Sequence, residues 1–496
     1  MLFNSINFLV FFPIVVLFYF LIPHRFRYIW LLVSSYYFYM CWNIKYALLM
    51  LFSTIVTYFS GVFIDYFRHR SGKNAAQMMK FCVAGSLILN LSVLFFFKYF
   101  NFALDNLAWV LNVAGVSFKR PVCDFLLPVG ISFYTFQALS YTMDVYRKEI
   151  RPEKNFLRYA LFVSFFPQLV AGPIERSKNL LNQFHEKHYF NYQRVKDGLL
   201  LMLWGFFMKL VIADRLAIFV DQVYNNWQRY GGIEIILATI FFAIQIYCDF
   251  GSYSNIAVGA AQVMGFTLMK NFCQPYFAVS VKDFWRRWHI SLTSWFRDYL
   301  YIPLGGNRKG KLRKQFNLMT VFLVSGLWHG ASWHYIAWGG LNGAYQIVGE
   351  ATQPWRNKIL DCLKVKRDCF SYRLFSQIVT FLLIDISWLF FRANGLRTAI
   401  GMLKRIWHHF ELGVLLDGSL LSIGIGRKDF TLLFFAIGML WLADLFHEHR
   451  KSIRQWLDGQ NLLFRWAVYY AAIFFIIIFG IYGFGYDATA FIYFQF

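Results

Sequence analysis

The sequence consists of long apolar runs separated by short basic connections. The candidate helices lie near residues 5–23, 28–43, 45–66, 80–97, 125–143, 157–172, 197–220, 234–266, 316–348, 374–391, 430–446 and 464–484. A helix of about 20 apolar residues crosses the hydrocarbon core of a bilayer, where only helices and closed barrels satisfy every backbone polar group. Charged residues make up only 15% of the chain, against about 25% in soluble domains. We therefore predict an all-α polytopic membrane protein.

Two of these runs are interrupted by proline and glycine. Pro128 and Gly130 break one run, and Pro167, Gly172 and Pro173 break another. Backbone that is not helical survives at membrane depth only where protein or a water-filled cavity covers it. We therefore expect roughly 11 spanning helices, with re-entrant or interfacial pieces between them. The sequence shows no internal repeat, which disfavours a transporter built of duplicated halves.

The net charge is +23, and much of it lies in the connections. Cytoplasmic loops of membrane proteins carry an excess of lysine and arginine. The basic segments 67–80, 147–158, 282–314 and 356–373 are therefore expected on the cytoplasmic side, with the tail after the last helix on the outer side. No basic patch belongs to a soluble domain, so nucleic-acid binding is not expected. The seven cysteines form no Cys-x-x-Cys pair and predict neither a disulfide framework nor a metal site.

The segment 282–334 places a basic surface directly before a histidine in an apolar run. Lysines and arginines crowd residues 282–314 among tryptophans, and no charged residue follows from Gln315 to Gly349. If this run is helical, His329 lies roughly 21 Å from its start. Ionisable groups at such depth are costly and mark functional sites. His329 is therefore the first candidate for chemistry.

Histidine is suited to take a proton from a hydroxyl near neutral pH, as acyl transfer from a thioester requires. The alternative for His329 is a core histidine whose hydrogen bonds are satisfied. His289 lies where basic and aromatic residues alternate, as in an interfacial amphipathic helix, and a purely structural role is equally possible. His334 would lie about 140° further round a helix than His329, so a two-histidine metal site is not expected.

Two further features are candidates for binding. Asp249 is an acid flanked by a long apolar run, and it could orient His329 or form a structural pair with an arginine at a helix end. The turn Tyr301–Asn307 contains two glycines and is followed by Arg308 and Lys309. Backbone N–H groups and cations of this kind suit the phosphates of an acyl donor. A plain cytoplasmic loop is the alternative.

Three motifs carry a resemblance to a known family. They are Phe284-Trp285-Arg286-Arg287-Trp288-His289-Ile290-Ser291-Leu292, Tyr301-Ile302-Pro303-Leu304-Gly305-Gly306-Asn307 and Gly326-Leu327-Trp328-His329-Gly330. The chain resembles the membrane-bound O-acyltransferase superfamily, in particular its bacterial alginate O-acetylase branch, over nearly its whole length. The resemblance implies one membrane domain over 1–496 around a central funnel, with a core at 125–350 and C-terminal helices and an aromatic tail at 374–496.

The resemblance also implies roles for individual residues. His329 would be the catalytic base, and His289 would lie near the donor entrance. Asp249 and Trp328 would orient the base or line the funnel. Contacts to the donor would come from the basic segment, through Arg286, Arg287, Asn307, Arg308 and Lys309.

The reaction implied by the resemblance is acetyl transfer from cytoplasmic acetyl-CoA, with no permanently bound cofactor. The product would be an O-acetylated polysaccharide outside the bacterial cytoplasmic membrane, such as alginate or peptidoglycan. An extracytoplasmic hydrolase-like acetyltransferase of the SGNH type would complete the transfer. Two alternatives stay open: D-alanyl transfer to teichoic acid, and a flippase or transporter for a polyisoprenyl-linked glycan.

The tail 490–496 is apolar, although chain ends are usually polar and loosely ordered. We therefore expect it to pack in a groove. Tyr493 carries its only hydroxyl, and the resemblance implies that this residue is an acyl relay. A phenol, with a pKa of about 10, is more acidic than an aliphatic alcohol, and its ester stays reactive. An anchor in the aromatic belt of the membrane is the alternative for Tyr493.

Overall fold

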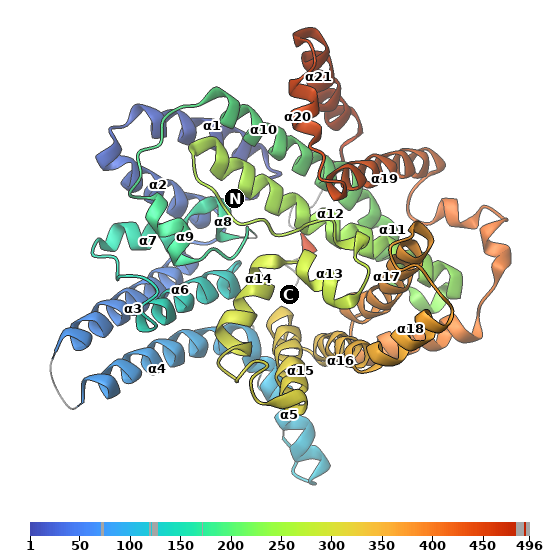
Figure 1. The fold of residues 1–496 in the computed structure, drawn as a ribbon, viewed down its shortest axis with the longest axis horizontal. Helices are drawn as coiled ribbons and strands as arrows, with labels where there is room; N and C mark the ends of the chain where they lie inside the picture. Colours follow the sequence, from blue (N-terminus) through green and yellow to red (C-terminus); the bar gives the residue numbers. More distant parts are fainter. Residues whose placement is uncertain (71–73, 119–120, 122–126, 171, 483–490, 493–496) are drawn as a thin grey trace. The chain divides into compact units, whose positions relative to one another are not determined.

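The computed structural model describes residues 1–70, 74–118, 121, 127–170, 172–482 and 491–492. Within these residues every regular element is a helix (Figure 1), which confirms the predicted all-α class. The chain forms two compact units: Met1–Met202 with Ile256–Met269, and Leu203–Asn255 with Lys270–Phe496. These boundaries differ from the predicted core at 125–350, and the single domain over 1–496 stays a prediction.

The first unit is built from the N-terminal helices and parts of two later ones. Its elements are α1 (Ile6–Leu21), α2 (His24–Met40), α3 (Ile44–His69), α4 (Ala75–Leu94), η1 (Phe95–Tyr99), α5 (Phe100–Val113), α6 (Ile131–Tyr146), α7 (Phe156–Ser164), α8 (Phe166–Leu169) and α9 (Ser177–Gln183), with most of α10 (Tyr192–Phe206) and the end of α12 (Gly232–Met264).

Small and hydroxyl-bearing residues join the helices of the first unit. Helices α3, α4 and α6 lie side by side (Figure 1). The Ser53 hydroxyl donates to the Asn90 side chain at 2.5 Å, and the Tyr159 hydroxyl donates to Thr57 at 2.6 Å. Membrane helices associate through small residues and interhelical hydrogen bonds, because lipid tails remove the hydrophobic drive between them. The polar residues within these apolar runs therefore have a packing role.

The predicted interruptions are present. Gly130 has a φ of +76° and directly precedes α6, and a Cβ there would lie 2.8 Å from the carbonyl oxygen of Leu169. Helix α8 is only four residues long and begins beside Pro167. Glycine at position 130 is therefore required twice, by the left-handed backbone and by the close approach of another segment.

The second unit contains the remaining helices. Its elements are the end of α10, a π-helical stretch η2 (Phe207–Ala213), α11 (Asp214–Asn225), η3 (Trp227–Arg229), most of α12, η4 (Pro275–Phe277), α13 (Val281–Arg287), α14 (Ile290–Phe296), η5 (Arg297–Tyr301), α15 (Gly310–His329), α16 (Trp333–Cys362), α17 (Phe370–Arg392), α18 (Leu396–His408), η6 (Leu412–Leu415), η7 (Ser419–Ser422), α19 (Arg427–Glu448), α20 (Ile453–Asp458) and α21 (Leu462–Phe479).

The predicted apolar run 316–348 is two helices, which corrects the expectation of one continuous helix. Helix α15 ends at His329, and α16 begins at Trp333 and packs closely along α15 (Figure 1). A Cβ at Gly326 would lie 2.3 Å from the Tyr335 carbonyl oxygen, and one at Gly339 would lie 2.2 Å from that of Phe322. These glycines let the two backbones touch, so the hairpin is fixed on both sides of its turn.

Six helices in the described part of the chain are long and apolar enough to cross a bilayer. They are Ile44–His69, Ala75–Val113, Gly232–Met264, Phe370–Arg392, Arg427–Glu448 and Leu462–Phe479. The chain is thus a multi-pass membrane protein. Some other helices fall short by length or charge, such as α1 with 16 residues and α15 with its basic start. The expected number of roughly 11 spans stays a prediction.

Candidate active site

His329 is the last residue of α15 and is only 4% exposed. Its ring centroid lies 4.9 Å from that of Trp328, 5.0 Å from that of Trp338 and 5.5 Å from that of Phe391. The interplanar angles are 83°, 87° and 75°, so the three aromatic rings meet the imidazole edge to face. Aromatic walls exclude water and strengthen any charge interaction of the ring. The structure thus places His329 in an apolar enclosure where the hairpin turns.

His289 is not in a helix, which corrects the expected interfacial amphipathic helix. It lies between α13 and α14 with a φ of +44°, and it is 1% exposed. Its Nδ1 lies 3.2 Å from the side-chain oxygen of Asn271, whose backbone carbonyl accepts a hydrogen bond from the Ile290 amide at 2.9 Å. The segment 271–273 therefore fixes the break in the chain and the direction of the imidazole. Burial lowers the pKa of His289 to about 3, so the ring is neutral at pH 7.

The fold brings the two sequence-predicted histidines together. The ring centroids of His289 and His329 are 6.4 Å apart, and Trp328 lies 6.2 Å from His289. On its other side, His289 meets the ring of Phe250 on α12 at 4.6 Å, at an interplanar angle of 71°. The pair thus places two imidazoles side by side among aromatic rings that limit the access of bulk water.

His334 belongs to a different helix from His329, so the expected 140° separation on one helix does not apply. Gly330 is extended, with a φ of −166°, and α16 starts after Ser332. The Ser332 hydroxyl lies 2.8 Å from His334 Nδ1. His334 therefore lies in the first turn of α16 and contacts the residue that precedes this helix. It is a control position for substitutions of His329.

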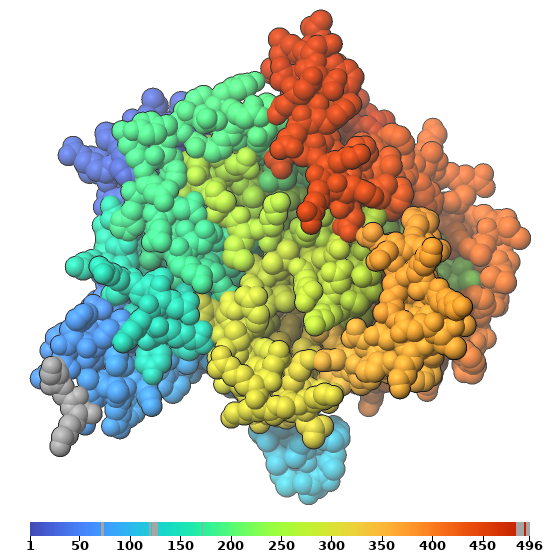
Figure 2. Space-filling view, in the orientation of Figure 1, coloured from blue at the N-terminus to red at the C-terminus, as the bar shows by residue number. Residues whose placement is uncertain are grey.

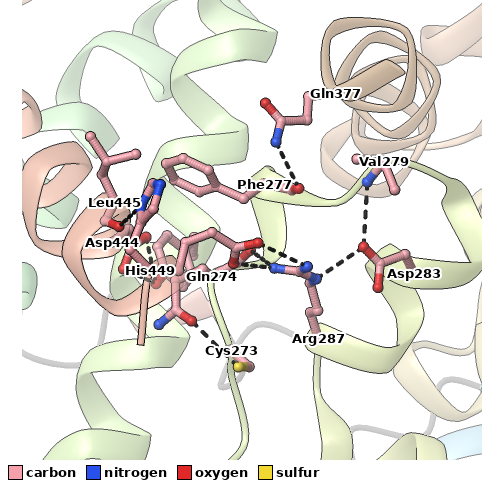
Figure 3. Close-up of polar contacts among 12 residues, drawn as sticks. Cys273, Gln274, Phe277, Val279, Asp283, Arg287, Gln377, Asp444, Leu445 and His449 are labelled. Atoms are coloured by element: carbon pink, nitrogen blue, oxygen red, sulfur yellow. Dashed lines mark hydrogen bonds and ion pairs between the residues drawn. The ribbon is translucent and has the colours of Figure 1, made fainter. Parts of the chain in front are cut away.

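Arg287 is tied to carboxylates. Its guanidinium donates to Asp283 at 3.0 Å and to the Gln274 carbonyl at 3.4 Å (Figure 3). It also donates to Glu448 on α19 at 2.6 Å. Asp283 also accepts the Val279 amide at 3.4 Å. These contacts join α13 to α19 and favour a structural role for Arg287 over a donor contact. Arg286, its neighbour, is exposed.

The basic turn before α15 has exposed cations, and a side chain of α15 holds its backbone by a hydrogen bond. Gly305 and Gly306 have φ values of +108° and +54°, and Asn317 donates to the Gly306 carbonyl at 3.0 Å. The Tyr301 hydroxyl donates to the side chain of Asn307. Arg308 and Lys309 are exposed, and the turn, in yellow, lies on the face that Figure 2 shows. The geometry suits either a phosphate site or a plain loop, as the sequence indicated.

Asp249 has partners other than His329. One carboxylate oxygen accepts from Lys209 at 2.6 Å, and the other accepts the backbone amide of Ile492 at 2.8 Å. Lys209 also pairs with Asp214 at 2.7 Å. The structural alternative for Asp249 therefore describes these contacts better, with a lysine in place of the expected arginine.

Tyr493 lies outside the described residues, whereas Phe491 and Ile492 before it are buried.

Sequence reasoning missed several residues around the site. Asn271, Trp338 and Phe391 gave no local signal, because each matters only through a partner distant in sequence. Lys209 did have a signal: it is the only charged residue of 198–213, and an ionisable residue inside such an apolar stretch is a functional candidate by position alone. Its place in a π-helical stretch adds to this, because π-bulges often lie at functional sites.

Fold and site together define a multi-pass helical membrane protein with a buried histidine pair. Residues 147–386, which include both histidines, match the family model described as MBOAT, membrane-bound O-acyltransferase family. The chain is 36% identical to the probable alginate O-acetylase AlgI of Pseudomonas aeruginosa over 433 residues, covering 86% of this chain and 79% of that protein. The chain therefore belongs to the membrane-bound O-acyltransferase family and is an O-acyltransferase.

Other relatives are named for different acceptor polymers. The peptidoglycan O-acetyltransferase of Helicobacter pylori is 36% identical over 404 residues, 76% of this chain and 73% of that protein. The teichoic acid D-alanyltransferase of Streptococcus thermophilus is 30% identical over 244 residues, 45% of this chain and 57% of that protein. The acetylases thus share a larger part of the chain than the D-alanyltransferase does.

Proposed function

We propose that this protein takes an acetyl group from acetyl-CoA on the cytoplasmic side of a bacterial cytoplasmic membrane and delivers it for O-acetylation of a cell-envelope polysaccharide. The observation that carries this proposal is the pair His289–His329, buried among aromatic rings and 6.4 Å apart. The acetyl group and the polysaccharide class are supported by the names of the relatives that match most of the chain.

In this proposal His329 is the general base. It takes the proton of an acceptor hydroxyl while that oxygen forms a bond to the thioester carbonyl carbon. The carbon–sulfur bond then breaks, and CoA leaves as its thiolate. The proton stays on His329 as the imidazolium. The neutral His289 directs its Nδ1–H to the side-chain oxygen of Asn271, so its Nε2 would be a hydrogen-bond acceptor near the donor entrance. The aromatic enclosure protects the thioester from hydrolysis, because it keeps water out.

The first acceptor in the proposal is the phenol of Tyr493. Its acetyl ester would then pass the group to a hydrolase-like SGNH-type partner outside the membrane, and from there to the polymer. This divides one difficult step across the membrane into two easier ones. The burial of Phe491 and Ile492, directly before Tyr493, supports a path in which this part of the chain reaches the protein interior.

The test uses full-length protein in lipid nanodiscs with radiolabelled acetyl-CoA. CoA release and acetyl label on the peptide that contains Tyr493 are followed together. We expect His329→Ala to lower both by at least about a hundredfold, because a positioned base contributes that much. His334→Ala is the matched control, and it should keep most of the activity because His334 bonds to Ser332 instead.

The alternatives give different results in the same system. Labelling by a D-alanyl carrier protein but not by acetyl-CoA would indicate D-alanyl transfer. Translocation of a glycolipid across vesicles without any release of CoA would indicate a flippase. Undiminished transfer by the His329→Ala protein would refute the proposed role of the base.

A further inference from the structure

Three charged side chains are buried together in the second unit. Lys209 on η2 is 1% exposed, and its ammonium lies 2.6 Å from Asp249 and 2.7 Å from Asp214. Burying charges away from water is expensive, and breaking such a cluster strands the remaining charge. Two carboxylates against one ammonium leave the cluster with an excess of acceptor oxygens, so it can bind a further donor.

That donor is a backbone amide far along the chain. The second oxygen of Asp249 accepts the Ile492 amide at 2.8 Å. One helical turn further along α12, the ring of Tyr253 stacks on that of Phe491, with the centroids 3.9 Å apart and 28° between the planes. Phe491 is 0% exposed and Ile492 is 3% exposed. The segment Phe491–Ile492 is thus held to α12 at two successive points, one polar and one aromatic.

The chain leaving α21 is anchored to the same region. The Ile481 amide donates to the Leu210 carbonyl at 2.9 Å, and Arg215 donates to the Phe479 carbonyl at 3.0 Å. The stretch around Lys209 therefore contacts the chain both where it leaves the last helix and at Phe491–Ile492. A plain ion pair between η2 and α12 would need neither contact.

The docked segment also lies close to the histidine site along α12. Phe250, which follows Asp249, meets the His289 ring at 4.6 Å, whereas Asp249 and Tyr253 meet the segment. One turn of α12 thus contacts both. A segment held at Phe491–Ile492 is limited in where its next residues can reach, because consecutive Cα atoms are only about 3.8 Å apart.

We propose that Lys209, Asp249 and Tyr253 form a docking site for the segment Phe491–Ile492, and that this docking positions the following residues for acyl transfer. The docking is independent of the reaction, whereas the positioning role rests on the proposed relay function. Lys209 acts by holding Asp249 in place and Asp249 by fixing the amide. They are positioning residues, because neither touches the donor.

Hydrogen exchange of the full chain in nanodiscs tests the docking. Asp249→Asn keeps the side-chain shape and leaves Lys209 with Asp214, so the buried cation keeps a partner. Phe491→Ala removes the stacking without changing any charge. Asp249→Asn should speed exchange of the Ile492 amide about tenfold or more, since a hydrogen bond to a charged acceptor is roughly that much stronger than one to a neutral acceptor. Phe491→Ala should also speed this exchange, because the segment loses its stacking on Tyr253.

Asp221→Asn is the matched control, because Asp221 on α11 pairs with Arg392 and not with the segment. It should leave exchange at Ile492 unchanged. Unchanged exchange at Ile492 in both Asp249→Asn and Phe491→Ala would overturn the docking site, and the Phe491 variant keeps this test valid if the Asp249 variant fails to fold.

Kinetics test the positioning role. Undocking should lower kcat for acetyl transfer to the peptide that contains Tyr493 and leave the KM for acetyl-CoA unchanged, because the donor side is intact. Full transfer together with fast exchange at Ile492 would overturn the positioning role. Failure of the proposed function is recognised separately, as wild-type protein that does not use acetyl-CoA. In that case the exchange result still decides the docking.

Discussion

The imidazoles of His289 and His329 lie edge to face, with ring centroids 6.4 Å apart and 64° between the ring planes. Their positions have separate local causes. His289 is set by a left-handed backbone and by Asn271, whereas His329 is set by the glycine contacts of the α15–α16 hairpin. A substitution at Asn271 or at a hairpin glycine should therefore displace one histidine of the pair and leave the position of the other unchanged.

The pH dependence of stability tests the burial of His289, which lies between α13 and α14 and outside the six candidate spans. Burial lowers its pKa to about 3, whereas the unfolded chain protonates it near 6.5. Between these values the unfolded state binds more protons, so stability present at pH 7 is lost as the pH falls from about 6.5 toward 3. At pH 5 the loss from this residue is about 2 kcal/mol.

Thermal unfolding of wild-type protein and His289→Asn at pH 7 and pH 5 measures this contribution. Asparagine tolerates a left-handed backbone, so it removes the titration with little added strain. The stability difference between the two proteins should shift by about 2 kcal/mol in favour of the variant at pH 5. A difference that does not change with pH would show that His289 is not kept neutral by the fold.

The hairpin that carries His329 should be sensitive to a single methyl group. A Cβ at Gly339 would lie 2.2 Å from the Phe322 carbonyl oxygen, whereas one at Gly340 would make an ordinary contact of 3.5 Å with Leu323. Gly339→Ala should therefore push α16 from α15 and destabilise the protein by about 1–3 kcal/mol, as overpacking does.

Gly340→Ala is the control for this prediction, because it adds the same methyl group one residue away. It should be neutral or slightly stabilising, since alanine is the better helix former. Unfolding midpoints and acetyl-transfer rates of the two variants are compared. Equal midpoints would mean that the close backbone contact does not hold the hairpin.

Sequence reasoning predicted the features that have local causes. The helical class follows from the apolar runs, and the break at Gly130 follows from glycine and proline chemistry. The break at Gly330 was not predicted, because single glycines are tolerated inside helices and this run contains others, such as Gly326 and Gly339. The contact that holds the two helices together joins distant residues: a Cβ at Gly339 would lie 2.2 Å from the Phe322 carbonyl oxygen.

The candidate site was predicted in part for the same reason. His329 and His289 carried motif signals, so both could be named from the sequence. The partners that define their surroundings, such as Asn271 and Phe391, are joined to them only by folding. Asp249 was recognised as a buried acid, but its pairing with Lys209 and with the Ile492 amide depends on contacts across the second unit.

The last prediction concerns the donor surface formed by the turn Tyr301–Asn307 with Arg308 and Lys309. Both cations are exposed, and the turn is held by Asn317, so a charge change there should not disturb the fold. Replacing Arg308 and Lys309 by glutamate should raise the KM for acetyl-CoA, because the donor carries several negative charges. The effect should weaken as salt rises, since added ions screen exposed charges over about 10 Å at 0.1 M.

The matched control replaces Arg450 and Lys451 by glutamate, because this pair is also adjacent, exposed and preceded by a helix end. It changes the net charge by the same amount, so it separates a local donor contact from the general field of the protein. Initial rates are measured against acetyl-CoA concentration at two salt concentrations. A KM that rises equally in both double variants would indicate long-range attraction, and a KM unchanged in the Arg308 and Lys309 variant would leave the turn as a topology signal only.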